Sequence, residues 1–233
     1  MTIFKVIILE DKKGYIDRII SEPGKYTLNL GCGRVNTFNE SIGVDIIDSQ
    51  AVDIVGDVYE VLERLPDSSV LTIYSSHFVE HLDDFTYFLE AVSRVLKPSG
   101  NLIIIAPHFS NPYYYSDITH KSTFGLYTCC YYCISTPLRR KVPTYGRNLK
   151  FRLDKVDLIF KSTRPNYGRH AIKKVIGSLF NTTISGPLLF FDSATISFTI
   201  ETVESVDPPS TTTIICSLDG SVCEINEERQ FPI

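Results

Sequence analysis

The chain has 233 residues, of which 43% are hydrophobic and 21% charged, and its formal net charge is −4. This composition is ordinary for a soluble globular protein with one large core. It lacks the basic field of a nucleic-acid-binding protein, so no nucleic-acid partner is expected. No apolar stretch reaches the length of about 18 residues that spans a membrane, and no secretion signal is recognisable, which favours a cytoplasmic protein.

The predicted elements alternate between strands and helices after a short amphipathic helix at 13–21. Strands are expected at 26–30, 42–46, 52–55, 70–75 and 102–106, and helices at 58–65 and 85–96. The strands are nearly continuous apolar runs, which is typical of parallel strands that are covered on both faces. The alternation predicts a Rossmann-like α/β fold, a mostly parallel sheet with helices on both faces.

The later part of the chain is β-rich. The runs at 151–161 and 193–203 predict antiparallel strands added to the sheet near the C-terminus. Asp207-Pro208-Pro209 marks a boundary, so we expect one domain over 1–206 and a β-rich tail over 207–233, where Asp219-Gly220 indicates a hairpin. The tail offers strands to another chain, so a homo-oligomer is among the partners considered.

Three successive strand ends carry residues suited to a nucleoside. Gly31 and Gly33 follow the strand at 26–30, and glycines let the backbone approach a ligand closely. Asp45 ends the next strand, where its carboxylate can accept hydrogen bonds from two ribose hydroxyls. Asp57 ends the third strand within reach of an adenine amino group, and Val58 can supply an apolar wall. Each feature alone has an ordinary structural explanation, but together they predict an adenosine-sized site.

Six motifs, in this order and spacing, resemble the class I S-adenosylmethionine-dependent methyltransferases, most of all the type-11 methyltransferase domain. They are LNLGCG, GVDI, VGDV, SSHFVEHL, RVLKPSG and LIIIAP, within about residues 25–128. The resemblance implies S-adenosylmethionine as cofactor and implies its binding residues, namely Asn29, Gly31, Cys32, Gly33, Asp45, Ile46, Asp57, Val58, Ser75 and Ser76. The sequence departs from the pattern at Asn36, where a third glycine is common, at Leu71, where an aspartate is frequent, and at Ser99, where the turn usually has a glycine.

Four of the five histidines follow the fourth and fifth strands of the alternation, namely His77, His81, His108 and His120. A neutral hydroxyl is a poor nucleophile, so methyl transfer to it needs a base, and imidazole accepts a proton near neutral pH. His108 is the first candidate for that base and His77 the second, and Asp117 and His120 complete the predicted catalytic set. For His81 a structural hydrogen bond is the favoured explanation.

The segment from Pro107 to Thr128 gathers six aromatic side chains around Asp117 and His120. With the residues up to 148 it is expected to form a lid or substrate segment, because long loops in compact domains often bind ligands. Its aromatic faces and polar tips suit a sugar or another ring-shaped polar substrate. The alternative is that these aromatics simply pack an ordinary element. The segment also resembles one in bacterial methyltransferases encoded near surface-glycan genes, which points to a glycan-type substrate class.

The cysteines do not predict a metal site. Without an export signal the six thiols, Cys32, Cys129, Cys130, Cys133, Cys216 and Cys223, are expected to be reduced. Cys130 and Cys133 have the local spacing of a zinc pair, but no second pair lies at the usual distance. No metal is therefore included in the predicted site.

The favoured function is O-methylation of a small-molecule or glycan-type substrate with a histidine base. One alternative is a methyltransferase-fold module that binds without catalysis. The other is a nicotinamide-dependent oxidoreductase, which predicts Gly-x-Gly-x-x-Gly and an acid about 20 residues further on. Here position 36 is Asn and the acid, Asp45, comes earlier.

Overall fold

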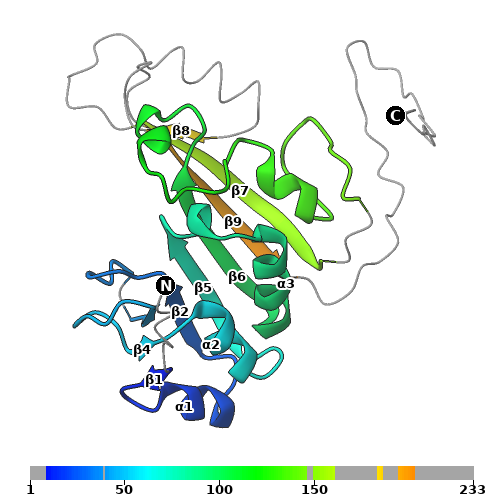
Figure 1. Ribbon diagram of the computed structural model, residues 1–233. Coiled ribbons are helices and arrows are strands. Elements are labelled where there is room, and N and C mark those ends of the chain that lie inside the picture. Colours follow the sequence, from blue (N-terminus) through cyan, green and yellow to red (C-terminus); the bar gives the residue numbers. More distant parts are fainter. Residues whose placement is uncertain (1–8, 39, 146–148, 161–182, 186–193, 203–233) are drawn as a thin grey trace, which may run out of the picture.

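The computed structural model describes residues 9–38, 40–145, 149–160, 183–185 and 194–202 (Figure 1). Its strands are β1 (Glu10–Asp11), β2 (Tyr26–Leu30), β3 (Ile42–Asp45), β4 (Ile54–Val55), β5 (Val70–Ser76), β6 (Leu96–Pro107), β7 (Phe151–Phe160), β8 (Thr183–Ser185) and β9 (Ala194–Thr202). Its α-helices are α1 (Tyr15–Ser21), α2 (Val58–Arg64) and α3 (Phe85–Val95), and its 3-10 helices are η1 (Val79–His81), η2 (Pro112–Ser116) and η3 (Thr128–Tyr132). The C-terminal tail predicted at 207–233 lies outside the described residues.

The described strands form one sheet in the order β1-β4-β3-β2-β5-β6-β9-β7-β8. Strands β4, β3, β2, β5 and β6 run parallel, and β9 runs antiparallel between β6 and β7. Figure 1 shows β9 and β7 extending the sheet beyond β6. This confirms the predicted Rossmann-like, mostly parallel sheet with antiparallel pairing near the C-terminus. The carboxyl ends of β2, β3, β4, β5 and β6 therefore meet along one edge.

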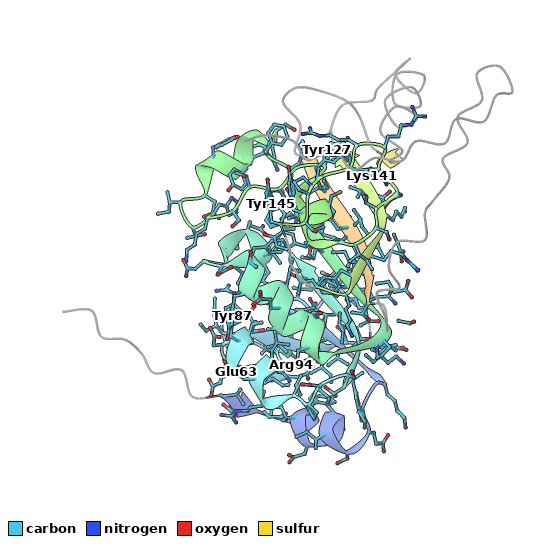
Figure 2. All side chains as sticks on the ribbon, turned by 90° about the vertical axis from the view of Figure 1, so that its right-hand side faces the viewer. Glu63, Tyr87, Arg94, Tyr127, Lys141 and Tyr145 are labelled. Carbon is cyan, nitrogen blue, oxygen red and sulfur yellow. The ribbon has the colours of Figure 1, made fainter. Side chains whose placement is uncertain are left out.

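The helices α2 and α3 lie side by side on one face of the sheet (Figure 1). Their apolar residues, among them Val61 and Phe88, are fully buried in the main core. Figure 2 shows Glu63, Tyr87 and Arg94 along this helix pair. The Arg94 guanidinium donates to the carbonyl oxygens of residues 62 and 65 at distances of 2.6 and 2.8 Å, which satisfies carbonyls left open at the end of α2. No helix in the described part of the chain is long and apolar enough to cross a membrane.

The connection from β2 to β3 is a loop, because the described residues between Gly31 and Ser41 form no helix or strand. Asn36 organises this loop. Its Oδ1 accepts from Asn29 Nδ2, Phe38 N and Ser41 Oγ at 2.8, 3.2 and 3.1 Å, and its Nδ2 donates to the Ser41 carbonyl at 3.0 Å. The residue that replaces the third glycine of the motif thus fixes the path of the chain with its side chain.

The cysteine cluster of the later chain belongs to the core. Cys129, Cys130 and Cys133 are free thiols and all are buried. Burial raises the pKa of each of the three. The thiol form is therefore the stable one, and these side chains pack as small apolar groups.

Candidate functional site

The glycine loop is held between β3 and the residue that precedes η1. Gly31 N and Cys32 N both donate to the Val44 carbonyl, at 2.9 and 3.3 Å. Gly31 has a φ of +70°, and a Cβ at this position would lie 2.4 Å from ring carbons of Phe78. Gly33 also has a positive φ, +65°, but a Cβ there would meet no described atom within 4 Å. The loop is thus packed below Gly31 and open at Gly33, as a ligand-binding loop requires.

Asp45 ties the loop to the end of β3. It is 9% exposed, its Oδ2 accepts from Gly33 N at 2.8 Å, and its Oδ1 accepts from Ile47 N at 2.8 Å. A carboxylate offers about four acceptor positions, so two remain for hydroxyl groups of a ligand. The two backbone bonds hold the carboxylate in one orientation before any ligand arrives.

The side chains predicted to contact the adenine differ in their exposure. Asp57 caps α2 by accepting from Tyr59 N at 2.8 Å and remains exposed, so it can also contact a ligand. Val58 is only 6% exposed and packs in the core, because it faces inward from the first turn of α2. Ile46 and Ile47 are 48% and 60% exposed and supply the apolar surface beside Asp45. Sequence reasoning did not select Ile47, although two isoleucines after a strand-ending acid are visible in the sequence.

Two buried polar atoms at this edge have no hydrogen-bond partner among the described residues. They are Oδ1 of Asn29, in β2, and Oγ of Ser75, in β5. The register pairs Asn29 with Tyr74 and Leu30 with Ser75, so the two side chains point to opposite faces of the sheet edge. Buried polar atoms are rarely left unpaired. An ammonium group is a donor that would fit Oδ1 of Asn29, as the predicted role of this residue requires.

Cys32 is a packing residue of the loop. Its side chain is 9% exposed, and burial, with the negative charge of Asp45 nearby, raises its pKa to about 11. The thiol therefore stays protonated at neutral pH and is a poor nucleophile. It supports the loop from below rather than reacting.

His77 stands directly after β5 at the same sheet edge, next to the partly buried Ser76. It has a φ of +54°, unusual for a residue other than glycine, and its N–H donates to the Ile105 carbonyl at 2.8 Å. Its side chain is 57% exposed, and its Nδ1 lies 3.5 Å from Oε1 of Glu80, whose side chain is 1% exposed. A buried carboxylate thus faces an accessible imidazole. Sequence reasoning missed Glu80, because nothing local shows that its side chain turns back toward His77.

The structure divides the other predicted catalytic residues into two places. His108 is 8% exposed, and its Nδ1 lies 2.8 Å from Ser110 Oγ. Burial lowers the pKa of His108, so its imidazole is neutral near pH 7. His120 lies instead beside His81, with ring centroids 4.8 Å apart, and its Nε2 is 3.7 Å from Asp117 Oδ2.

The aromatic segment after β6 is partly core and partly surface. Phe124 and Tyr114 are buried, and Phe124 bridges to His108 through the backbone. Phe109, Tyr113 and Tyr115 are 51%, 68% and 69% exposed. The buried members anchor the segment to the fold, and the exposed members form an aromatic surface beyond the carboxyl end of β6.

The sheet order defines a Rossmann-like protein, with a glycine loop after β2 and an oriented carboxylate at the end of β3. Residues 28–104 match the family described as "Methyltransferase domain". This match covers about a third of the chain and supports a class I S-adenosylmethionine-dependent methyltransferase with S-adenosylmethionine as cofactor, as the sequence motifs imply. The open space at Gly33, the oriented carboxylate of Asp45 and the unpaired Oδ1 of Asn29 fit this cofactor.

One solved structure shows the same fold at low identity, and a second aligns less closely. A protein from Bacillus halodurans, described as a candidate methyltransferase, aligns with 13% identity and a TM-score of 0.51, over 81% of this chain and 98% of that one. A SAM-dependent methyltransferase from Archaeoglobus fulgidus aligns with 22% identity and a TM-score of 0.46, over 81% and 92%. No curated protein matches the chain significantly.

Proposed function

We propose that the protein methylates a hydroxyl oxygen of a small-molecule or glycan-type acceptor, with His77 as the base. The observation that carries this proposal is the exposed His77 imidazole at the carboxyl end of β5, with its Nδ1 3.5 Å from the buried Glu80 carboxylate. A proton on Nδ1 is held by that carboxylate, which leaves the Nε2 lone pair to accept the hydroxyl proton as the oxygen attacks the methyl group. The left-handed backbone of His77 costs about 1–2 kcal/mol, a kind of strain that concentrates at functional positions.

His108 ranks second as the base, which reverses the order expected from the sequence. Its imidazole is neutral near pH 7 but only 8% exposed, and Ser110 already occupies its Nδ1. An acceptor molecule reaches the more accessible His77 with less rearrangement. His108 then serves to position Ser110 and Phe109 at the start of the aromatic segment.

The cofactor supplies an electrophilic methyl group on its sulfonium when bound. We assign the ribose hydroxyls to Asp45, the adenine to Asp57, Ile46 and Ile47, and the amino group to Asn29. The loop from Gly31 to Gly33 passes under the methionine part, and Ser75 and Ser76 border the sulfonium. These residues hold and orient the cofactor, and such positioning accounts for much of the acceleration of a methyl transfer.

The acceptor class follows from the segment 107–148, which we propose as the substrate-binding part of a domain over 1–206. Phe109, Tyr113 and Tyr115 expose aromatic faces, and Asp117 adds a carboxylate that can accept from hydroxyl groups. Aromatic faces stack on the apolar face of a sugar ring, while polar tips read its hydroxyls. A small sugar-like acceptor satisfies both features.

The test incubates the purified protein and isotope-labelled S-adenosylmethionine with a panel of monosaccharides, nucleotide sugars and phenols. We expect transfer of label to at least one acceptor, and an O-methyl signal rather than an N-methyl signal by NMR of the product. His77→Ala should lower the turnover number at least about 100-fold, in the range of a lost general base. Its affinity for S-adenosylmethionine should be unchanged by calorimetry.

His108→Ala is the matched control, because it removes a second imidazole from the same sheet edge. It should lower turnover by less than about tenfold. A His108→Ala variant that loses more turnover than His77→Ala would transfer the role of base to His108. Methyl transfer to nitrogen or carbon acceptors alone would refute O-methylation.

A further inference from the structure

A second group of polar side chains gathers next to the catalytic edge. Glu80, His81 and His120 each place one potential ligand atom so that the three atoms lie within 4.8 Å of one another. Glu80 and His81 belong to η1, whereas His120 comes from the segment after β6. The backbone joins the two segments here, since Lys121 N and Ser122 N donate to the Glu80 carbonyl at 2.7 and 3.2 Å.

The hydrogen bonds of the two imidazoles fix which nitrogen carries the proton. Thr119 Oγ1 donates its single proton to Asp117 Oδ1 at 2.6 Å, so the bond of 2.9 Å between this oxygen and Nδ1 of His81 must be donated by the imidazole. Nδ1 of His120 lies 2.9 Å from the Tyr114 carbonyl, which can only accept. Each ring therefore holds a proton on Nδ1, and each Nε2 keeps a free lone pair in the neutral imidazole. Histidines that bind metals commonly have this arrangement, because the outer bond orients the ring.

The Glu80 carboxylate gives a second, independent indication of a cation site. Its side chain is 1% exposed, and its Oε2 has no hydrogen-bond partner within the described ranges. A buried carboxylate without full compensation is costly, since it loses its hydration. His77 faces Oε1 and leaves Oε2 available. A cation bound between the Glu80 carboxylate and the two Nε2 atoms would compensate the buried negative charge.

We propose that Glu80, His81 and His120 bind a divalent transition-metal ion, of which Zn²⁺ is the best match. Two imidazoles and one carboxylate are a donor set of borderline softness, which suits zinc better than calcium or magnesium. Ligand atoms at about 2.0–2.2 Å from a zinc ion lie about 3.3 Å from one another. Small side-chain rotations must therefore bring the three ligand atoms, now within 4.8 Å of one another, closer together. Asp117 Oδ2, 3.7 Å from His120 Nε2, is in place to complete the shell directly or through water. The ion would tie the substrate segment to η1, and this proposal does not depend on the reaction proposed above.

The test uses the full chain, freed of metal with a chelator and of any affinity tag, and titrated with Co²⁺ as a spectroscopic probe and with Zn²⁺. We expect about one equivalent per chain after dialysis, measured by elemental analysis, and the visible bands of low-symmetry Co²⁺. Zn²⁺ should raise the Tm of the wild type. His120→Ala and Glu80→Gln should weaken binding at least about tenfold and abolish the rise in Tm.

Two control variants make the test specific. His108→Ala removes a histidine outside the group and should retain the ion, and Cys130→Ser tests whether a cysteine binds it instead. Loss of the ion in Cys130→Ser but not in His120→Ala, with a thiolate charge-transfer band in the Co²⁺ spectrum, would overturn the proposed ligand set. Absence of retained metal in the wild type would overturn the proposal itself.

Discussion

The two glycines of the loop allow a paired substitution that separates folding from cofactor binding. Gly31→Ala and Gly33→Ala add the same methyl group at nearly the same φ, +70° and +65°. In Gly31→Ala the new Cβ would lie 2.4 Å from the Phe78 ring, whereas in Gly33→Ala it would meet no described atom within 4 Å. The backbone strain is therefore common to both variants, and the clash belongs to only one.

The magnitudes follow from these contacts. A non-glycine residue in the left-handed region costs about 1–2 kcal/mol, which is the expected loss of unfolding free energy for Gly33→Ala. Overpacking against Phe78 adds about 1–3 kcal/mol in Gly31→Ala. The added methyl of Gly33→Ala enters the space that we assign to the cofactor. This variant should thus lose at least about tenfold in S-adenosylmethionine affinity while remaining folded.

The assay combines urea unfolding with calorimetric titration of S-adenosylmethionine for both variants. Gly31→Ala should show the larger fall in unfolding free energy. Gly33→Ala should show a loss of affinity out of proportion to its loss of stability. Equal destabilisation of the two variants would refute the packing of Gly31 on Phe78, and unchanged affinity in Gly33→Ala would refute the location of the cofactor.

Three further predictions concern single side chains. Asp45→Asn keeps the shape of the side chain but removes the negative charge of the carboxylate, whose two oxygens accept hydrogen bonds from backbone N–H groups. It should lower the unfolding free energy by about 1–3 kcal/mol and weaken cofactor affinity, and a wild-type affinity by calorimetry would contradict its assignment to the ribose. Burial raises the pKa of Cys32 to about 11, so its thiol should be alkylated slowly at neutral pH and much faster as the pH approaches 11. Peptide mass spectrometry measures the alkylation rate. Rapid alkylation at neutral pH would show that the thiol is not buried as described. His108 has a lowered pKa in the folded state, so between that value and about 6.5 the unfolded chain binds more protons. The unfolding free energy should therefore be unaffected by His108 above about pH 6.5 and should fall as the pH drops below that value. His108→Asn should make the unfolding free energy, measured with urea, less dependent on pH in this range.

The glycine loop and its acids could be predicted because their geometry is local. Asp45 stands two residues before Ile47, whose N–H it accepts, and its strand neighbours the strand that leads into the loop. The strand ends follow from short apolar runs, and parallel pairing brings them to one edge. The positions of the tight turn at Gly31 and of the acid Asp45 at a strand end can therefore be predicted from the sequence.

The surroundings of Glu80 could not be predicted in this way. The sequence shows an acid between two histidine positions, His77 and His81, but gives no sign that His120 meets it from a segment 40 residues later. That meeting depends on how the segment after β6 returns over η1, through the bonds of Lys121 and Ser122 to the Glu80 carbonyl. Contacts set by the path of a long loop have no periodicity or spacing that sequence reasoning can use.

Phe78 shows why the cofactor loop and the proposed base occupy a fixed relative position. Its ring lies where a Cβ of Gly31 would be, and it packs edge-on against Phe88 of α3, with ring centroids 6.2 Å apart. The residue before it, His77, turns out of β5 with a positive φ and bonds to β6. One aromatic side chain thus separates the glycine loop from the base and is itself held by the core. Because close-packed interiors do not deform gradually, the spacing between the glycine loop and the proposed base is set by folding and not by the arrival of ligands.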